Sequence, residues 1–243
     1  MTTEPAESSL RPDLFAGKTA LVVGGTSGIG AAIAGLFTQL GAQTWAVGLG
    51  ADRVSPDLAV ELDLRQPDVL ESFIDGLSTL DILVNSAGII NRAAEYEPEV
   101  FARVVEVNLT GTMRACVRAR PLLAQTRGCI INMASMLSFL GGPLVPAYTA
   151  SKGGVLALTR SLAVAFAAEG IRVNALAPGW ISTELTQPLR ADPAADSRLL
   201  ARTPMGRWGT PAEVAAAAAF LASPDARFIT GAVLPVDGGY LAA

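Results

Sequence analysis

The sequence predicts an α/β domain built on a doubly wound parallel sheet of about seven strands, with helices on both faces. Short apolar runs without polar alternation, typical of strands that are buried on both sides, alternate with longer segments of helical length. Hydrophobic residues make up 51% of the chain and charged residues 16%, which is enough apolar material for a large core.

The predicted elements follow one another along nearly the whole chain. A strand at 19–24, a helix at 28–40, strands at 43–47 and 58–62, a helix at 68–77 and a strand at 81–85 come first. Helices at 98–107 and 109–125 precede a strand at 129–134. A long helix at 147–168 leads to a strand at 171–177. A helix at 211–221, favoured by its alanine run, leads to the last strand at 232–236.

One connection is shorter than this fold usually requires. Only about ten residues join the strands at 43–47 and 58–62, whereas a parallel crossover normally takes a dozen or more. We therefore expect one helical turn or none in the connection at 48–57. No internal repeat or linker divides the chain, so we expect a flexible tail at 1–13 and a single domain at 14–243.

The composition excludes several classes of protein. The formal charge is −4 and no basic run could follow a phosphate backbone, which excludes a nucleic acid partner. No apolar run is long enough to span a membrane, and the polar N-terminus does not resemble a signal peptide. The chain has two cysteines, too few for a disulfide framework, which indicates a cytoplasmic location.

The chain contains no histidine. This excludes catalysis by a histidine base, including serine–histidine–aspartate triads. It also removes the commonest metal ligand, so we expect no metal site. Acid–base chemistry must therefore come from a carboxylate, a tyrosine, a lysine or a thiol.

A glycine-rich segment lies between the first predicted strand and the first helix. It reads Val22-Val23-Gly24-Gly25-Thr26-Ser27-Gly28-Ile29-Gly30. Glycines allow a sharp turn and close approach of a ligand, and the following helix N-terminus can bind a pyrophosphate. Taken alone, the segment is also compatible with an ordinary turn.

Tyr148 and Lys152 are four residues apart in the long predicted helix, so they share one face. A nearby ammonium favours the phenolate over the neutral tyrosine, which would lower the pKa of Tyr148. Such pairs are also frequent on protein surfaces. Ser135, however, follows the fifth strand, at the edge where parallel sheets bind ligands.

These motifs together resemble the short-chain dehydrogenase/reductase family, from about residue 14 to 240. Gly24, Gly28 and Gly30 match its glycine signature, with Val23 in place of the usual threonine. The resemblance implies a Rossmann fold, a nicotinamide dinucleotide cofactor and a hydride-transfer reaction. It further implies a catalytic tetrad made of Asn108, Ser135, Tyr148 and Lys152.

The resemblance also assigns cofactor contacts to the segments that follow five strands and to the long helix. The expected contacts are Gly24, Thr26, Ser27, Gly28, Ile29, Gly30, Gly48, Asp63, Leu64, Asn85, Ala87, Gly88, Tyr148, Lys152, Pro178, Gly179, Ile181 and Thr183.

The choice between NAD and NADP stays open at this stage. A carboxylate at the end of the second strand binds the ribose hydroxyl of NAD, and an arginine there accepts the phosphate of NADP. Gly48 occupies that position and offers neither group. Arg53 could reach back from the short connection, but a solvated loop charge is the simpler interpretation. NAD is slightly favoured.

The substrate is indicated by local similarity alone. The segments 131–139, 145–152, 189–192, 206–209 and 236–241 resemble the branch that contains 2-deoxy-D-gluconate 3-dehydrogenases, so we expect a sugar acid or a polyol. Arg92 could bind a substrate carboxylate, or pair with Glu95 or Glu97 at the surface. Leu137 and Trp180 are further candidate substrate contacts, although Trp180 and Trp208 fit the core equally well. The segment 181–207 is interpreted as a mobile lid.

Two other functions remain as alternatives. A 3-oxoacyl thioester reductase would share the fold and tetrad, but it would need a basic patch to dock its acidic carrier protein. A non-catalytic dinucleotide sensor is disfavoured because Tyr148 and Lys152 are both present. The resemblance further implies a homotetramer, with interfaces at 228–243 and on the helix of Tyr148.

Overall fold

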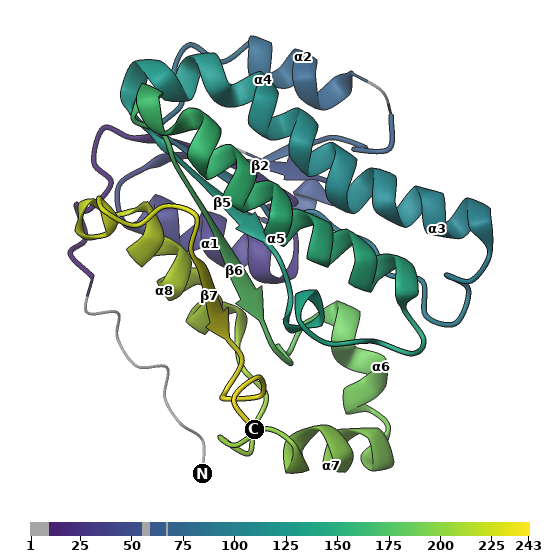
Figure 1. Ribbon diagram of the computed structural model, residues 1–243. Helices are drawn as coiled ribbons and strands as arrows, with labels where there is room; N and C mark the ends of the chain where they lie inside the picture. The colour runs from purple at the N-terminus through teal and green to yellow at the C-terminus, as the bar shows by residue number, and fades with distance from the viewer. Residues whose placement is uncertain (1–9, 55–58, 67) are drawn as a thin grey trace.

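The computed structural model describes residues 10–54, 59–66 and 68–243, without the side chain of Arg53. In these residues seven parallel strands form one sheet in the order β3-β2-β1-β4-β5-β6-β7 (Figure 1). The strands are β1 (Thr19–Val23), β2 (Gln43–Gly48), β3 (Ala59–Glu61), β4 (Ile82–Asn85), β5 (Cys129–Met133), β6 (Arg172–Pro178) and β7 (Val233–Val236). The order runs outward in both directions from β1 and β4. The predicted doubly wound α/β fold is therefore confirmed.

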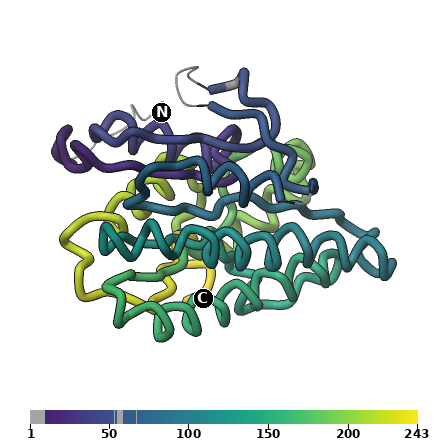
Figure 2. Tube along the Cα trace, turned by 90° about the horizontal axis from the view of Figure 1, so that it is seen from above, coloured from purple at the N-terminus to yellow at the C-terminus, as the bar shows by residue number. Residues whose placement is uncertain are grey.

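The helices cover both faces of the sheet (Figure 1). They are α1 (Gly28–Gln39), α2 (Val69–Asp75), α3 (Pro98–Val105), α4 (Gly111–Thr126), α5 (Pro146–Phe166), α6 (Gln187–Arg190), α7 (Pro193–Ala201) and α8 (Pro211–Ala222). Helices α1 and α8 lie on one face, and α2, α4 and α5 on the other. Figure 2 shows α3 and α5 side by side along one edge of the molecule.

Alternate residues of the strands point into two separate cores. Val22 packs in a cluster with Phe37 of α1 and Val214 of α8. Its neighbour Leu21 lies in the other cluster, with Leu123 of α4. All five of these side chains are 0% exposed. Burial on both faces explains why the strand sequences show no polar alternation.

The short connection after β2 contains a single 3-10 turn, Ala51–Arg53, in its described part. This agrees with the expected single turn. Leu58, which the sequence assigned to the third strand, lies outside the described residues, as do residues 1–9 of the predicted tail. Leu10 and Leu14 pack against the core cluster of α1 and α8.

Helices α6 and α7 were not predicted, because the segment 181–207 is rich in proline and polar residues. Its sequence does contain a helix start. Asp192 accepts hydrogen bonds from the backbone N–H groups of Ala194 and Ala195, and Pro193 is the first residue of α7. An acidic N-cap followed by proline is a standard beginning of a helix. Both helices lie beyond the end of β6 (Figure 1).

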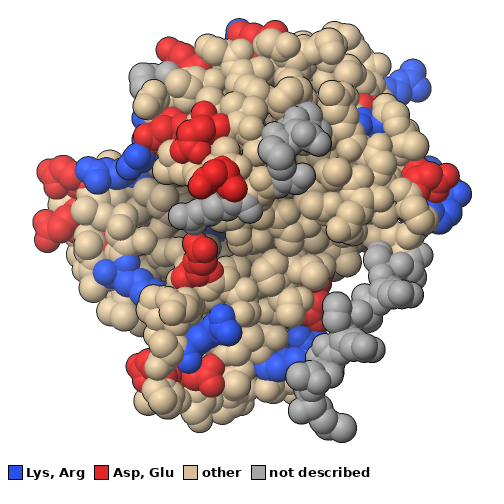
Figure 3. Space-filling view, turned by 180° about the vertical axis from the view of Figure 1, so that it is seen from behind, with Lys and Arg blue, Asp and Glu red and all other residues tan. Residues whose placement is uncertain are grey.

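Charges are interspersed on the surface. On the face shown in Figure 3, basic and acidic side chains lie close to one another, and no extended basic patch covers that face. In the described part of the chain, no helix is long and apolar enough to cross a bilayer.

Candidate active site

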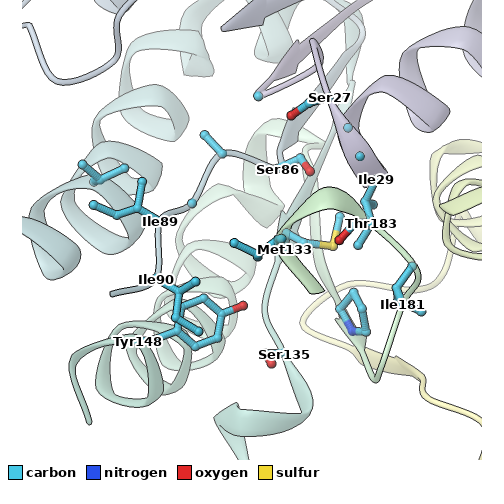
Figure 4. Close-up of a pocket in the computed structure, with 18 of the residues that line it drawn as sticks. Ser27, Ile29, Ser86, Ile89, Ile90, Met133, Ser135, Tyr148, Ile181 and Thr183 are labelled. Atoms are coloured by element: carbon cyan, nitrogen blue, oxygen red, sulfur yellow. The ribbon is translucent and has the colours of Figure 1, made fainter. Parts of the chain in front are cut away.

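A cavity of about 570 Å³ opens where the strands end. The segments that follow β1, β2, β3, β4, β5 and β6 all contribute to its lining, together with α5. Ligands bind at this edge in doubly wound sheets, and the volume lies within the usual range for ligand pockets, roughly 300–1,000 Å³. Figure 4 shows Ser27 and Ile29 on one side of the space and Tyr148 on the other.

Seventeen of the predicted cofactor contacts line this cavity. They are Gly24, Thr26, Ser27, Gly28, Ile29, Gly30, Gly48, Asp63, Leu64, Ala87, Gly88, Tyr148, Lys152, Pro178, Gly179, Ile181 and Thr183. Asn85 is the exception. Its side chain lies in the core, where Nδ2 donates to Oδ1 of Asn132 at 2.9 Å and to Sγ of Cys116 at 3.3 Å. Asn85 therefore supports β4 and β5 from within the sheet.

The glycine-rich segment is tightly packed against its neighbours. Gly24 has a φ of +79°, and a Cβ there would lie 2.5 Å from the backbone nitrogen of Ala87. A Cβ on Gly30 would lie 2.0 Å from the carbonyl oxygen of Gly24. Larger residues at either position would push the segment out of place. These two glycines hold the backbone against the loop after β4.

The first turn of α1 faces the cavity with open hydrogen-bond donors. The N-cap residue Ser27 makes no side-chain capping bond. The first N–H groups of a helix have no partner inside the helix, and their positive dipole end attracts anions. Gly28 leaves space towards Thr183, whose Cγ2 would be 3.5 Å from a Cβ at that position. The residues present therefore fit the pyrophosphate of a dinucleotide.

The end of β2 carries neither of the usual groups for choosing a cofactor. A side chain at Gly48 would come within 2.6 Å of Oγ1 of Thr26, which donates to the carbonyl oxygen of Leu49 at 2.8 Å. Asp63 lies near the end of β2, since the N–H of Leu62 donates to the carbonyl of Gly48 at 3.0 Å, and it forms a bidentate ion pair with Arg65 at 2.8 Å. This pairing lowers the pKa of Asp63.

Tyr148 and Lys152 lie one turn apart on α5, as the spacing predicted, and both line the cavity. Ser135 lies directly after β5, where its Oγ accepts from the N–H of Leu137 at 3.1 Å. Figure 4 shows the hydroxyl groups of Tyr148 and Ser135 in the same part of the cavity. Burial raises the pKa of Tyr148, while a hydrogen bond from Ser135 opposes this rise.

Lys152 is 4% exposed, and its Nζ donates to the carbonyl oxygen of Met133 at 2.7 Å. Burial lowers its pKa to about 8. The Nζ lies 5.6 Å from the ring centre of Tyr148. Lys152 is not among the groups that lower the pKa of Tyr148 in this structure, and burial raises that pKa above its ordinary value. Arg92 and Ser135 lower that pKa instead, and Glu95 raises it.

Asn108 is fully buried between the loop after β4 and α5. Its Oδ1 accepts from the N–H of Ile89 at 2.8 Å, and its Nδ2 donates to the carbonyl of Ile89 at 3.0 Å and to Oγ of Ser151 at 3.1 Å. It sits in a π-helical turn, Glu106–Thr110, between α3 and α4. Such turns are frequent at functional sites. The predicted helix junction at Asn108 is this wider turn.

The candidate substrate residues lie at the same cavity. Arg92, Leu137 and Trp180 all line it. Arg92 makes no ion pair with Glu95 or Glu97 within the described residues; Glu95 is bonded to backbone groups instead. Trp180 packs edge to face against Trp208 at 5.9 Å and Tyr240 at 6.3 Å, so it is a packed wall of the cavity.

Several residues of the site were missed from the sequence. The loop after β4 adds Ser86, Ile89 and Ile90 to the lining, and Figure 4 shows Ile90 beside Tyr148. Ser138 connects the segment after β5 to α5, because its Oγ accepts from the N–H of Ser135 and donates to the carbonyl of Lys152 at 2.7 Å. The capping spacing of Ser135 and Ser138 could have indicated this role.

Comparison with known proteins supports the fold and the class of reaction. A family model described as enoyl-(acyl carrier protein) reductase matches residues 23–241. The 2-dehydro-3-deoxy-D-gluconate 5-dehydrogenase of Bacillus subtilis is 41% identical over 241 residues, covering 93% of this chain and 95% of the relative. The cis-4-hydroxycyclohexanecarboxylate dehydrogenase of Sinomonas cyclohexanicum is 42% identical over 248 residues, covering 95% and 99%.

A solved structure shows the same architecture. It is provisionally described as an NAD(P)-dependent gluconate 5-dehydrogenase from Beutenbergia cavernae, with NADP bound at low occupancy. It superposes with a TM-score of 0.87 at 40% identity and covers 96% of this chain and 100% of its own. With matches over nearly the whole length, and with the glycine segment, Ser135, Tyr148 and Lys152 around one cavity, the chain belongs to the short-chain dehydrogenase/reductase family and is an NAD(P)-dependent oxidoreductase.

Proposed function

We propose that Tyr148 exchanges a proton with the secondary hydroxyl or ketone oxygen of a sugar acid or polyol. The observation that carries this proposal is the pairing of its buried hydroxyl with Ser135 inside the cavity. In the oxidation direction, the substrate O–H gives its proton to Tyr148 and the carbon gives up its hydrogen as hydride. A bound nicotinamide supplies the hydride acceptor, and its positive ring favours the tyrosine anion.

The other tetrad residues orient and support this step. Ser135 holds the substrate oxygen beside the tyrosine hydroxyl. Lys152, whose buried Nζ lies next to the loop after β4, holds the cofactor ribose. Asn108 keeps that loop in place through its two bonds to Ile89. A proton relay through water at Asn108 and Lys152 is part of the proposal, since both side chains lie beside Gly88.

We propose that Arg92 binds a carboxylate of the substrate. Its guanidinium lies close enough to Tyr148 to lower the pKa of the tyrosine, so an anion at Arg92 would be near the reacting hydroxyl. The relative from Bacillus subtilis is named for a sugar acid and that from Sinomonas cyclohexanicum for a cyclic hydroxy acid. A carboxylate is common to both names. Arg92→Ala should raise KM for acidic substrates and leave KM for neutral polyols unchanged.

We propose that the chain accepts both dinucleotides and prefers NAD. Arg65, at the end of the cavity near Gly48, is already paired with Asp63. A 2′-phosphate would have to compete with that carboxylate, whereas a ribose hydroxyl would not. The ratio of kcat/KM for NAD to that for NADP tests this preference, and a ratio below one would contradict it.

A 3-oxoacyl thioester reductase is the second candidate, and the description of the matching family model favours it. The net charge of −4 and the mixed charges in Figure 3 disfavour docking of an acidic carrier protein.

We further propose a cytoplasmic homotetramer. Phe228, fully exposed, and Val164 of α5, 82% exposed, are apolar side chains in the two predicted interfaces.

The absorbance of reduced nicotinamide tests the proposed function directly. Purified protein would be screened with NAD and NADP against sugar acids, matched neutral polyols and 3-oxoacyl thioesters. The proposal predicts turnover of a sugar acid that exceeds turnover of the thioesters. Turnover of thioesters alone would support the second candidate, and turnover of none would contradict both. Light scattering of the same sample would give the oligomeric state.

A further inference from the structure

Glu95 is a buried carboxylate that the reaction described above does not use. It is 0% exposed and lies between β4 and α3, on the same segment as Arg92. Removing a carboxylate from water is unfavourable by several kcal/mol unless hydrogen bonds replace the solvent (about 2–7 kcal/mol even for a neutral polar group). The buried carboxylate of Glu95 therefore needs hydrogen-bond donors from the protein in place of water.

Those partners are backbone N–H groups of two different segments. Oε1 accepts from Asn91 at 2.9 Å, next to Arg92, and Oε2 accepts from Tyr148 at 2.8 Å. Since α5 begins at Pro146, the N–H of Tyr148 belongs to its first turn and has no acceptor within the helix. A negative charge is also favourable at a helix N-terminus. One carboxylate thus connects the Arg92 segment to the catalytic helix.

Two more hydrogen bonds join the same segments. The N–H of Ala93 donates to the carbonyl of Leu144 at 2.8 Å, and the hydroxyl of Tyr96 donates to the carbonyl of Pro143 at 2.7 Å. Ala93 has a φ of +65°, a left-handed conformation that disfavours side chains by about 1–2 kcal/mol. The strained turn is kept because these bonds hold it in place.

We propose that Glu95 is a positioning residue that fixes the distance between Arg92 and the Tyr148 hydroxyl. The inference rests on the proposed roles of Tyr148 and Arg92. Charged groups facing Tyr148 are Arg92 and Glu95 from this segment and Lys152 from α5, while Ser135 approaches from β5. Oε2 of Glu95 lies 2.8 Å from the backbone nitrogen of Tyr148, and its charge raises the pKa of that tyrosine while Arg92 lowers it, so loss of the Glu95 charge should also move the acidic limb of the pH profile.

Two variants separate the geometry of Glu95 from its charge. Glu95→Gln keeps the shape but removes the charge and leaves one of the two N–H groups facing an amide donor. It should lower kcat/KM for an acidic substrate at least tenfold, raise its KM and move the acidic limb to lower pH. Glu95→Asp keeps the charge but moves it away by one methylene. It should lower kcat/KM at least fivefold with the acidic limb unchanged.

The controls identify effects on folding and on cofactor binding. Glu97→Gln removes an exposed carboxylate two residues further on and should behave as wild type. NAD affinity of both Glu95 variants, measured by quenching of tryptophan fluorescence, should remain within twofold of wild type. If Glu95→Gln does not fold, Glu95→Asp alone decides, and an unchanged kcat/KM overturns the inference.

The outcomes also separate this inference from the proposed function. Wild-type protein that turns over no hydroxy acid would overturn the proposed function, and the role of Glu95 with it. Wild-type turnover that disappears in Tyr148→Phe, together with wild-type kcat, KM and pH profile in Glu95→Gln, would overturn the role of Glu95 alone. A KM effect of Glu95→Gln that vanishes in the Arg92→Ala background supports positioning of Arg92.

Discussion

The burial of Lys152 destabilises the fold, and Lys152→Met should reveal by how much. The ammonium is 4% exposed, and burial lowers its pKa from 10.5 to about 8. Each unit of such a shift corresponds to about 1.4 kcal/mol of free energy. The charged lysine therefore destabilises the folded chain by about 3 kcal/mol at pH values well below 8.

The sign of the pH dependence follows from the same shift. The folded chain has the lower pKa, so the unfolded chain binds more protons between pH 8 and 10.5. The stability of the wild type therefore rises with pH across that window, by up to about 1.4 kcal/mol per unit. Methionine removes this slope. It also leaves the carbonyl of Met133 without its donor, at a cost of about 1 kcal/mol.

Lys152→Met should thus be more stable than wild type by about 2 kcal/mol at pH 7, and this difference should disappear towards pH 10. Urea unfolding of both proteins at equal concentration and at pH 7, 8.5 and 10 measures it. A variant that is less stable than wild type at pH 7, or that keeps the wild-type pH slope, would refute the reasoning.

Three further predictions concern the loops around the cavity. Gly30→Ala should abolish dinucleotide binding and lower the free energy of unfolding by about 2–3 kcal/mol, because the new Cβ would overlap the backbone of Gly24. Gly35→Ala on the same helix is the control, since its Cβ would meet no atom within 4 Å, and it should be neutral or stabilising. Calorimetry measures both variants. Asn108→Ala should destabilise by about 3 kcal/mol in urea, because both backbone groups of Ile89 lose their partner, and a loss below 1 kcal/mol would count against this. Arg65→Ala should lower kcat/KM for NADP at least fivefold and leave that for NAD within twofold, while an equal effect on both would exclude contact with a 2′-phosphate.

The sheet could be predicted because both of its faces are buried. The run at 129–134 shows no regular alternation of apolar and polar residues, as expected for a strand that is covered on both faces. In the structure, β5 spans Cys129–Met133. Helices α6 and α7 were missed because they pack beyond the sheet and lack a long apolar face. Their start was still encoded, in Asp192 followed by Pro193.

The site was predictable where chemistry restricts the residue type. Positions where a Cβ would clash must be glycine, and Tyr148 and Lys152 must lie one helical turn apart. Both requirements are recognisable in the sequence. Glu95 left none, since its function depends on contact with Tyr148, a residue 53 positions away. The direction of the Tyr148 pKa shift was predicted wrongly for a similar reason: spacing places Lys152 nearby but does not reveal that burial raises the pKa of the tyrosine and lowers that of the lysine.

The most direct test of the account is the turnover of Tyr148→Phe. This change removes only the hydroxyl that is paired with Ser135, so packing and the dinucleotide cavity should remain intact. General acid–base catalysis contributes roughly 10²–10⁴-fold to a rate. We predict a loss of at least a hundredfold in kcat, with the dissociation constant for NAD within twofold of wild type. Turnover near the wild-type value would contradict the assignment of Tyr148 as the proton donor and acceptor.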